Sequence, residues 1–402
     1  MRSSVKGDRI RTSPPHIVIV GKGGAFWLGG RQYTLNLLHA LIEARNEEAQ
    51  FDLSLLVRDP AELEHFASIR AHLRVCSDIE SVQQPYSLSN RIRWRIKRSL
   101  LGWTTPRMEE ALTALGATFS YPVRSSRVRS ADWIPDFQYR YFPDGSNPAE
   151  VEARKVEFSR IVRDAGRVVL SSACAERDCL ELFPNSSGRT LVLRFRVFVD
   201  PAWLGDEPLE TVRRYHLPTR YALISNLLAP TKNHDIVLET LAAMDRGSRE
   251  RVHIVCTGDV YDYRNPAFRE VFLARIQSLG VGDQISILGA IPKRDQIQLL
   301  RGSVCYLQPS LFEGWNTGVE EARLLGKAIL LSDIPVHREQ SPDSAAFFDP
   351  RNPADLAYRI EEVFSSANER GHDRTSERNA IQRYAGLRQE FGREFLGMAL
   401  QT

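Results

Sequence analysis

Two glutamates, Glu313 and Glu321, flank a turn that leads into a predicted helix. A helix that follows a glycine-containing turn presents unpaired N–H groups, which bind anions and most commonly phosphate. Carboxylates do not bind phosphate, so we interpret the two glutamates as acceptors for hydroxyl groups on either side of it. Phosphate between hydroxyl groups is the pattern of a sugar nucleotide. The alternative is that Glu321 is a solvated helix residue and that Glu313 only favours the helix dipole.

Three elements must position these side chains. A short apolar run at 303–307 predicts a buried strand, and a loop rich in proline, serine and glycine follows it. Thr317 and Glu320 have the spacing of a capping box, so we expect the helix to begin at Thr317 and to end near Gly326. Glu320 then has a local structural role, and Glu321 is left for a ligand.

The composition excludes several classes of protein. A chain of 402 residues suggests two or three domains, and 43% hydrophobic with 26% charged residues describes a globular protein. The net charge of +3 does not favour bulk binding of nucleic acid. Five scattered cysteines without a Cys-x-x-Cys pair predict reduced thiols. Without a long apolar segment or an apolar stretch in the polar N-terminus, we expect a cytoplasmic protein.

The beginning of the chain predicts a Rossmann-like unit. A strand at 16–20, a glycine-rich turn at 21–30 and a helix at 31–43 follow one another. This order places a helix N-terminus at the carboxyl end of a strand. Phe26 replaces the third glycine of a Gly-x-Gly-x-x-Gly dinucleotide motif, so a dehydrogenase is a weaker alternative that stays open.

Apolar runs alternate with helical spacing along the rest of the chain, which predicts an α/β fold of two Rossmann-like domains with mainly parallel sheets. The second series of strands begins at 221–225. We therefore predict four segments: a flexible tail 1–15, an acceptor domain 16–204, a nucleotide-sugar domain 205–376, and a C-terminal helix 377–402 with room to cross back to the first domain.

The most basic segment lies at 89–101. As a helix it would place Arg91, Arg95 and Arg98 on one side, a stripe that could lie on an anionic membrane surface. An ordinary solvated helix is the alternative.

Several segments, in this order and spacing, resemble the retaining GT-B glycosyltransferases of family four (glycosyl transferases group 1), and the similarity covers most of the chain. The paired glutamates at 309–322 resemble the family's main motif most strongly. The other similar segments are Gly29-Gly30, 132–138, 225–226, 232–234, 289–292 and 326–332.

The resemblance implies a metal-independent hexosyltransferase whose nucleotide-sugar donor, UDP- or GDP-linked, is a co-substrate bound to the second domain across a cleft from a glycan or lipid-linked acceptor. It implies that Glu321 binds the ribose, Glu313 the donor sugar and Lys232 the diphosphate, with Glu313 and Lys232 as the catalytic pair. The further implied donor-side residues are Gly314, Trp315, Asn316, Thr317, Gly318, Asn226, Ile291, Gly29 and Gly30. Asp136 is implied on the acceptor side.

The resemblance also implies a role in bacterial surface polysaccharide or glycoconjugate synthesis, at the inner face of the membrane. It requires no protein nucleophile, because the leaving phosphate is thought to assist the incoming hydroxyl. No Asp-x-Asp occurs in the chain, so no metal or other cofactor is expected.

Three positions depart from the family's pattern. Leu227 and Leu228 occupy the neighbourhood where an arginine usually precedes the phosphate-binding lysine. Tyr139 stands where the acceptor motif commonly ends in histidine, and residues 315–317 are bulkier than usual, which predicts an altered choice of donor. A sugar-nucleotide epimerase, a phosphorylase and a catalytically inactive partner subunit remain alternatives.

Overall fold

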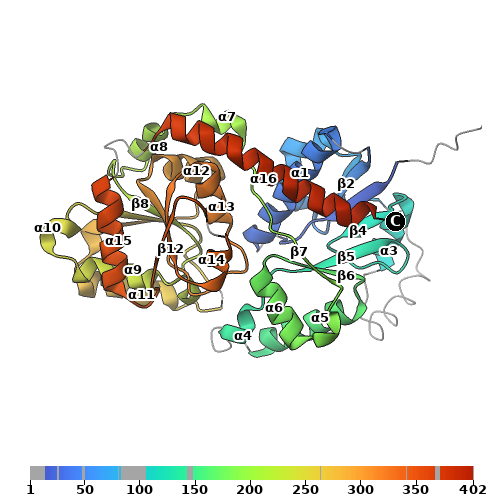
Figure 1. The fold of residues 1–402 in the computed structure, drawn as a ribbon, viewed down its shortest axis with the longest axis horizontal. Coiled ribbons are helices and arrows are strands. Elements are labelled where there is room, and N and C mark those ends of the chain that lie inside the picture. The colour runs from blue at the N-terminus through green and yellow to red at the C-terminus, as the bar shows by residue number, and fades with distance from the viewer. Residues whose placement is uncertain are drawn as a thin grey trace, which may run out of the picture. The chain divides into compact units, whose positions relative to one another are not determined.

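The computed structural model describes residues 14–24, 27–47, 50–79, 81–82, 106–142, 148–262, 264–340, 342–366 and 372–401 (Figure 1). By its internal contacts the chain divides into two compact units. Unit 1 comprises Met1–Asp132 with Gly392–Thr402, and unit 2 comprises Trp133–Phe391. The domain limits inferred from the sequence remain a prediction, because this grouping follows contacts alone.

The strands form two parallel sheets, which confirms the predicted α/β fold. The first has the order β3-β2-β1-β4-β5-β6-β7 and the second β10-β9-β8-β11-β12-β13. The strands of the first sheet are β1 (His16–Val20), β2 (Asp52–Val57), β3 (Val75–Asp78), β4 (Phe119–Tyr121), β5 (Arg129–Ile134), β6 (Arg167–Leu170) and β7 (Thr190–Val192). Those of the second are β8 (Ala222–Ser225), β9 (Ile254–Thr257), β10 (Ile285–Gly289), β11 (Cys305–Gln308), β12 (Ala328–Ser332) and β13 (Ala345–Phe348).

Helices connect the strands, as parallel pairing requires. The longer ones are α1 (Leu28–Glu47), α3 (Pro106–Ala114), α5 (Pro148–Asp164), α6 (Ala173–Leu182), α9 (His234–Ala243), α11 (Phe268–Leu279), α12 (Lys293–Gly302), α13 (Thr317–Leu324), α15 (Pro353–Ser366) and α16 (Arg374–Leu400). The short ones are α4 (Gln138–Tyr141), α7 (Pro201–Leu204), α8 (Pro208–Arg214), α10 (Arg246–Arg249) and α14 (Pro335–Gln340), with 3₁₀ helices η1 (Pro60–His72), η3 (Pro184–Ser186), η4 (Pro230–Lys232) and η5 (Gly282–Gln284).

Burial on both faces explains why the central strands read as continuous apolar runs. In β8, Ala222 and Ile224 belong to one core cluster of unit 2, while Leu223 between them belongs to the other. Successive side chains of a strand point to opposite faces, so the two clusters lie on the two sides of this sheet. Strands β5 and β7 were missed in the sequence analysis because neither is a continuous apolar run.

Helix α1 begins earlier than predicted, at Leu28 rather than at residue 31. Gly29 and Gly30 therefore lie in its first turn and not in a loop. A Cβ atom on Gly30 would come within 2.6 Å of the Trp27 ring. Glycine is required at this position because the indole ring of Trp27 occupies the space that a side chain would need.

The C-terminal helix α16 contributes to both units, since unit 1 begins again at Gly392 (Figure 1). In unit 1, the ring of Phe395 meets Tyr121 and Phe119 of β4 edge-on, with centroid distances of 5.1 and 6.1 Å. The end of the helix is therefore part of the core of unit 1, which confirms that the last helix returns to the first half of the chain.

Two glycines of α16 provide a matched test of this packing. Replacing Gly392 by alanine is expected to lower the free energy of unfolding by about 1–3 kcal/mol, because the new Cβ would lie 2.8 Å from the carbonyl oxygen of Ala40 in α1. Gly397→Ala meets nothing within 4 Å and should stabilise the helix by up to ~1 kcal/mol. Urea denaturation measures both, and equal effects of the two changes would contradict the packing.

Some predictions lie outside the described residues, among them the basic stripe of Arg91, Arg95 and Arg98 and most of the N-terminal tail. Within the described ranges, none of the helices has the length and apolar character needed to cross a membrane. All five cysteines are free, as predicted.

Candidate active site

The turn between β11 and α13 carries the predicted site. Helix α13 begins at Thr317, but its N-cap is Asn316, whose side-chain oxygen accepts a 2.9 Å hydrogen bond from the N–H of Val319. The predicted capping box of Thr317 and Glu320 is therefore wrong. Asparagine is as good an N-cap as threonine, and it stands one residue earlier.

Glu320 instead has a role in the core of unit 2. Its side chain is fully buried, and one oxygen accepts hydrogen bonds from Arg196 at 3.0 Å and from the hydroxyl of Tyr384 at 2.7 Å. The other accepts from the amide of Gln340 at 2.8 Å. The carboxylate therefore ties α13 to α14, α16 and the segment after β7, which makes Glu320 structural for a different reason than the predicted one.

Lys232 and Glu313, predicted as the catalytic pair, are in direct contact. The ammonium of Lys232 lies 2.7 Å from Oε1 of Glu313, and the same oxygen accepts hydrogen bonds from Gln308 at 2.9 Å and Ser310 at 2.7 Å. Among the described residues, none donates to Oε2 of Glu313. That oxygen is available to a hydroxyl group of a ligand.

The charge of Lys232 also keeps the carboxyl group of Glu313 ionised. Burial by itself would raise the pKa of this carboxyl, but the ammonium and its hydrogen bond hold the pKa of Glu313 below its ordinary value. Glu313 is therefore an anion at neutral pH. An anionic acceptor beside a cation can bind a sugar hydroxyl and a phosphate side by side.

Sheet topology explains how residues so far apart in sequence meet. Strands β8 and β11 are parallel neighbours, so their carboxyl ends lie at the same edge of the sheet. Next to them, Asn233 adopts a left-handed backbone with φ of 56°. Its amide donates to the carbonyl groups of Pro309 at 3.1 Å and Pro350 at 2.9 Å. These bonds hold the turn that presents Lys232 against the turn that presents Glu313.

Glu321 is buried, so the alternative of a solvated helix residue is wrong. Its Oε1 pairs with Lys293 at 2.5 Å and its Oε2 accepts from Gln296 at 3.1 Å, both in α12. The sequence analysis missed Lys293. A lysine in the first turn of a helix opposes the helix dipole, and that mismatch was a signal that it has an anionic partner.

The remaining donor-side residues on the second sheet have structural contacts as well. Asn226 donates to Oε1 of Gln308 at 3.2 Å, which links β8 to the network around Glu313. Ile291, in the connection from β10 to α12, packs against the core cluster that contains Leu223. Their predicted contacts with the nucleotide stay predictions.

Gly314 in the turn and Gly318 at the start of α13 are both required for close packing. A Cβ on Gly314 would lie 2.7 Å from the carbonyl oxygen of Pro135 and 2.8 Å from Cβ of Asp136. One on Gly318 would lie 2.0 Å from the hydroxyl of Tyr306. Asp136, predicted on the acceptor side, thus lies directly against the donor turn within unit 2.

The bulky part of the turn is held by the protein itself. Trp315 is buried and donates its indole N–H to the carbonyl of Phe195 at 3.1 Å. Asn316 caps α13, and Thr317 opens it. These contacts give the side chains of Trp315 and Asn316 structural roles, and their expected part in the choice of donor stays a prediction.

The acceptor-side segment is anchored by aromatic packing. Tyr139 is buried against Phe137 and Phe158, so it belongs to an apolar cluster. Asp136 accepts a 2.9 Å hydrogen bond from the N–H of Gln138, and burial raises its pKa. The fold thereby brings a third carboxyl close to the Lys232 and Glu313 charges.

His337, a residue that the sequence analysis did not consider, is buried near this pair. Its Nδ1 lies 2.9 Å from the carbonyl oxygen of Ser332 and 3.1 Å from its hydroxyl. Burial lowers the pKa of His337, so the ring is neutral at neutral pH. A single histidine in a short helix gives no sequence signal for such a position.

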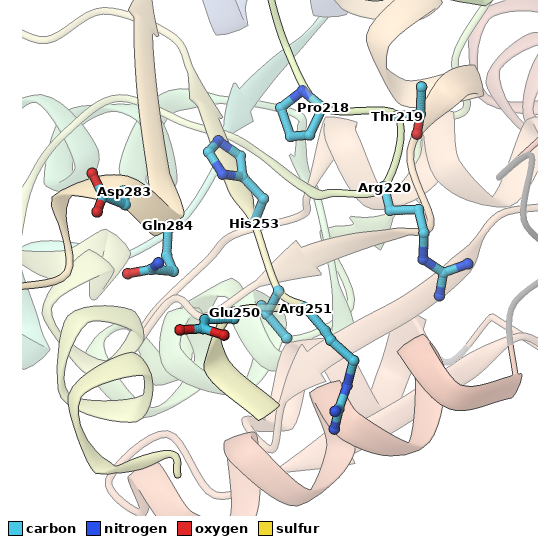
Figure 2. Close-up of a pocket in the computed structure, with 9 residues that line it drawn as sticks. Pro218, Thr219, Arg220, Glu250, Arg251, His253, Asp283 and Gln284 are labelled. Atoms are coloured by element: carbon cyan, nitrogen blue, oxygen red, sulfur yellow. The ribbon is translucent and has the colours of Figure 1, made fainter. Parts of the chain in front are cut away.

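Two cavities occur in unit 2 away from these carboxylates. The first, of about 260 Å³, lies before the amino ends of β8, β9 and β10, with Arg220, Arg251 and His253 in its wall (Figure 2). The second, of about 280 Å³, is lined by apolar side chains, Arg269 and Gly289 beside the carboxyl end of β10. The first is therefore at the opposite edge of the sheet from Lys232 and Glu313.

No group of three or more histidine, cysteine, aspartate or glutamate side chains suited to a metal occurs in the part of the chain that the structure describes. Metal independence stays a prediction from the sequence.

Comparison with known proteins agrees with the fold. Residues 215–383 match the family model described as Glycosyl transferases group 1. A search of the curated proteins finds no match. Among solved structures, Anabaena HepE in complex with UDP and glucose aligns with a TM-score of 0.62 and 15% identity, over 96% of this chain and 99% of that one.

Two further structures align over nearly the whole chain. A glycosyltransferase from Rickettsia africae has a TM-score of 0.66 and 14% identity, over 97% of this chain and 100% of its own. Sucrose-phosphate synthase from Thermosynechococcus elongatus has a TM-score of 0.63 and 15% identity, over 96% and 99%. The chain thus has the GT-B fold, and its residues 215–383 are similar to the group 1 glycosyltransferase family.

Proposed function

We propose that this glycosyltransferase transfers a hexose, with retention of configuration, from a nucleotide sugar to a glycan or lipid-linked acceptor. The contact of Lys232 with Glu313 supports the proposal most directly. It joins a phosphate-binding cation and a sugar-binding anion at the carboxyl ends of β8 and β11, where ligands bind in open parallel sheets.

Each charged group has a role in the proposed reaction. Glu313 uses its free oxygen to accept a hydroxyl of the donor sugar, and Lys232 binds the diphosphate. Negative charge grows on the leaving phosphate as the glycosidic bond breaks, so a fixed cation stabilises the transition state more than the ground state. The incoming hydroxyl gives its proton to that phosphate, and no protein nucleophile is needed.

Glu321 binds the ribose in this scheme. Lys293 and Gln296 each occupy one of its oxygens, but an ionised carboxylate has about four acceptor sites, so positions for ribose hydroxyls remain. The two partners also fix the orientation of the carboxylate. Lys293 therefore acts as a positioning residue for Glu321.

The donor is proposed to be UDP-linked, with a GDP-linked sugar as the second choice. HepE was solved with UDP and glucose, and an aligned trehalose-6-phosphate protein from E. coli was solved with UDP-2-fluoro glucose. We also propose a role in surface polysaccharide or glycoconjugate synthesis at the inner face of the membrane. That part rests on the sequence, including the basic segment at 89–101.

A nucleotide screen tests the donor. With UDP, GDP, ADP, dTDP and NAD, we expect UDP or GDP to raise the melting temperature, since a ligand at 100 times its Kd stabilises the folded state by about 2.7 kcal/mol. A shift with NAD alone would overturn the proposal in favour of a dehydrogenase. Release of a changed sugar nucleotide without an acceptor would instead identify an epimerase.

A further inference from the structure

Gln308, the last residue of β11, is a polar side chain in the core of unit 2. It is fully buried, as are Cys305, Tyr306 and Leu307 before it. A buried amide destabilises the fold unless its hydrogen bonds are formed, and strands of parallel sheets are mostly apolar for this reason. Successive side chains of a strand alternate between its faces, so Tyr306 and Gln308 lie on the same one. The strand therefore brings two polar side chains together at its carboxyl end.

The charge of Glu313 determines which way the amide of Gln308 points. Lys232 keeps Glu313 ionised, so both carboxylate oxygens can only accept hydrogen bonds. The group of Gln308 that lies 2.9 Å from Oε1 of Glu313 is therefore its NH₂ group. The same NH₂ group lies 2.8 Å from the hydroxyl oxygen of Ser310, and that hydroxyl donates to Oε1 of Glu313 at 2.7 Å. Both hydrogens of the amide are thus directed at Glu313 or at a group that donates to it.

Two further groups fix the oxygen of the same amide. Oε1 of Gln308 accepts from the hydroxyl of Tyr306 at 2.9 Å and from the amide of Asn226 at 3.2 Å. Asn226 follows β8, the parallel neighbour of β11. Tyr306 is fully buried, and its hydroxyl lies 2.0 Å from the position of a Cβ on Gly318, so α13 restricts the ring. All hydrogen-bonding positions of Gln308 are occupied, and a flipped amide would turn its oxygen toward an anion.

These contacts decide which oxygen of Glu313 can meet a ligand. A carboxylate oxygen has about two lone-pair positions. Lys232, Gln308 and Ser310 all donate to Oε1, so no position remains on that atom. Because β11 lies in the interior of its sheet, the two uncharged groups at its end also oppose rotation of the carboxylate. Oε2 is therefore the oxygen that a hydroxyl group can reach.

We propose that Gln308 is a positioning residue of the transferase, which directs Oε2 of Glu313 to a hydroxyl of the donor sugar and is itself oriented by Tyr306 and Asn226. The contact with the sugar rests on the proposed function. The orientation of Glu313 by Gln308 does not, because it follows from hydrogen bonds within the protein. Without the amide, Glu313 loses one hydrogen bond directly, and Ser310 loses the N–H group that turns its own hydrogen toward Glu313.

Gln308→Met tests this role, because methionine has nearly the same length and no N–H group. With the donor found in the nucleotide screen, kcat/KM should fall by about 10-fold or more, the scale of one lost hydrogen bond to a charged group. Activity needs ionised Glu313 and is lost as the pH falls through its pKa. Loss of a hydrogen bond to the ionised form raises that pKa, so the acidic limb of the kcat/KM profile should move to higher pH. A merely structural role would leave this limb in place.

Gln298 offers a matched control, since it is a buried glutamine of α12 in the same unit and donates to the carbonyl of Trp203 at 2.7 Å. Gln298→Met should lower stability but leave kcat/KM and the acidic limb unchanged. Tyr306→Phe is a second variant that keeps the test open if Gln308→Met does not fold. It removes only the hydroxyl that orients Gln308, so kcat/KM should fall by about threefold, with the acidic limb displaced in the same direction.

Carbon-13 NMR of the full chain, labelled at the glutamate carboxyl carbons, follows Glu313 without a transfer assay. Its signal is the one that disappears in Glu313→Gln, and it should titrate at higher pH in Gln308→Met than in wild type. An unchanged titration in Gln308→Met and Tyr306→Phe, or a raised one with unchanged kcat/KM, would overturn the positioning role. If the titration moves but no nucleotide raises the melting temperature of the wild type, the proposed function fails and the orientation of Glu313 by Gln308 stands.

Discussion

Replacing Lys232 by alanine is expected to lower the rate of sugar transfer by about 100-fold or more, the scale of a lost charge-assisted contact in the transition state. The loss has two causes. The leaving phosphate loses its cation, and Glu313 loses the partner that holds its pKa low. Steady-state kinetics with the donor found in the nucleotide screen measure the effect as kcat/KM.

Lys155 is the matched control for this change. It is an exposed lysine of α5 in the same unit, 3.8 Å from Glu152. Lys155→Ala should leave transfer within about twofold of wild type, because an exposed ion pair contributes little. Near wild-type turnover of Lys232→Ala with the true donor would show that the site has been assigned to the wrong residues.

Replacing the two neighbouring glutamates of α13 is expected to have different effects, a loss of stability for Glu320 and a loss of activity for Glu321. Glu320→Ala should lower the free energy of unfolding by about 3–5 kcal/mol, because it leaves the largely buried Arg196 without its anion. Glu321→Ala should lower transfer by about 100-fold, through loss of a hydrogen bond to the donor, with a smaller effect on stability. Its partner Lys293 keeps 33% of its side chain exposed and can be solvated again.

Urea denaturation and donor kinetics on the two single variants measure this contrast. Glu320→Gln is the conservative control. It keeps an acceptor for the Tyr384 hydroxyl and should retain more stability than alanine at this position. If Glu321→Ala lost as much stability as Glu320→Ala and kept its activity, both residues would be structural and the ribose contact would be excluded.

A bound donor has to share Lys232 with the protein. Without ligand, the ammonium satisfies the carboxylate of Glu313, which otherwise would be buried without a cation. In the proposed complex, the same ammonium contacts phosphate while Glu313 gains a sugar hydroxyl. The phosphate replaces Glu313 as the anion beside Lys232, and the sugar hydroxyl replaces Lys232 as a donor to Glu313. Both charged groups therefore keep a partner in the empty site and in the occupied one.

The strands of both sheets were largely predictable, and so was the meeting of Lys232 with Glu313. The apolar run at 16–20 identified β1 to the residue, and the second series of strands begins with β8 at Ala222–Ser225, as expected for the run at 221–225. Once the strands are parallel neighbours, their carboxyl ends share an edge, so residues that follow two such strands come together. Strand β7 escaped detection because three residues are too few for a periodic pattern, and β5 because polar residues interrupt its apolar ones.

The limits of helices were less predictable. Asn316 and Thr317 are both good N-caps, and only the backbone path of the turn decides between them. Helix α1 begins at Leu28, although two glycines in a first turn read as a loop. The ring of Trp27 fills the space that these glycines leave, and that contact is not visible in a local sequence pattern.

The sequence by itself determined the α/β class, the alternation of strands and helices along the chain, and the turn and helix that carry Glu313 and Glu321. These properties follow from short-range periodicity and from the conformations that individual residues allow. Only the tertiary structure decided that Glu320 is a core residue, because its partners Arg196 and Tyr384 lie 124 and 64 residues away along the chain. Such an ion pair exists only after folding has brought its members together, so no local pattern can reveal it.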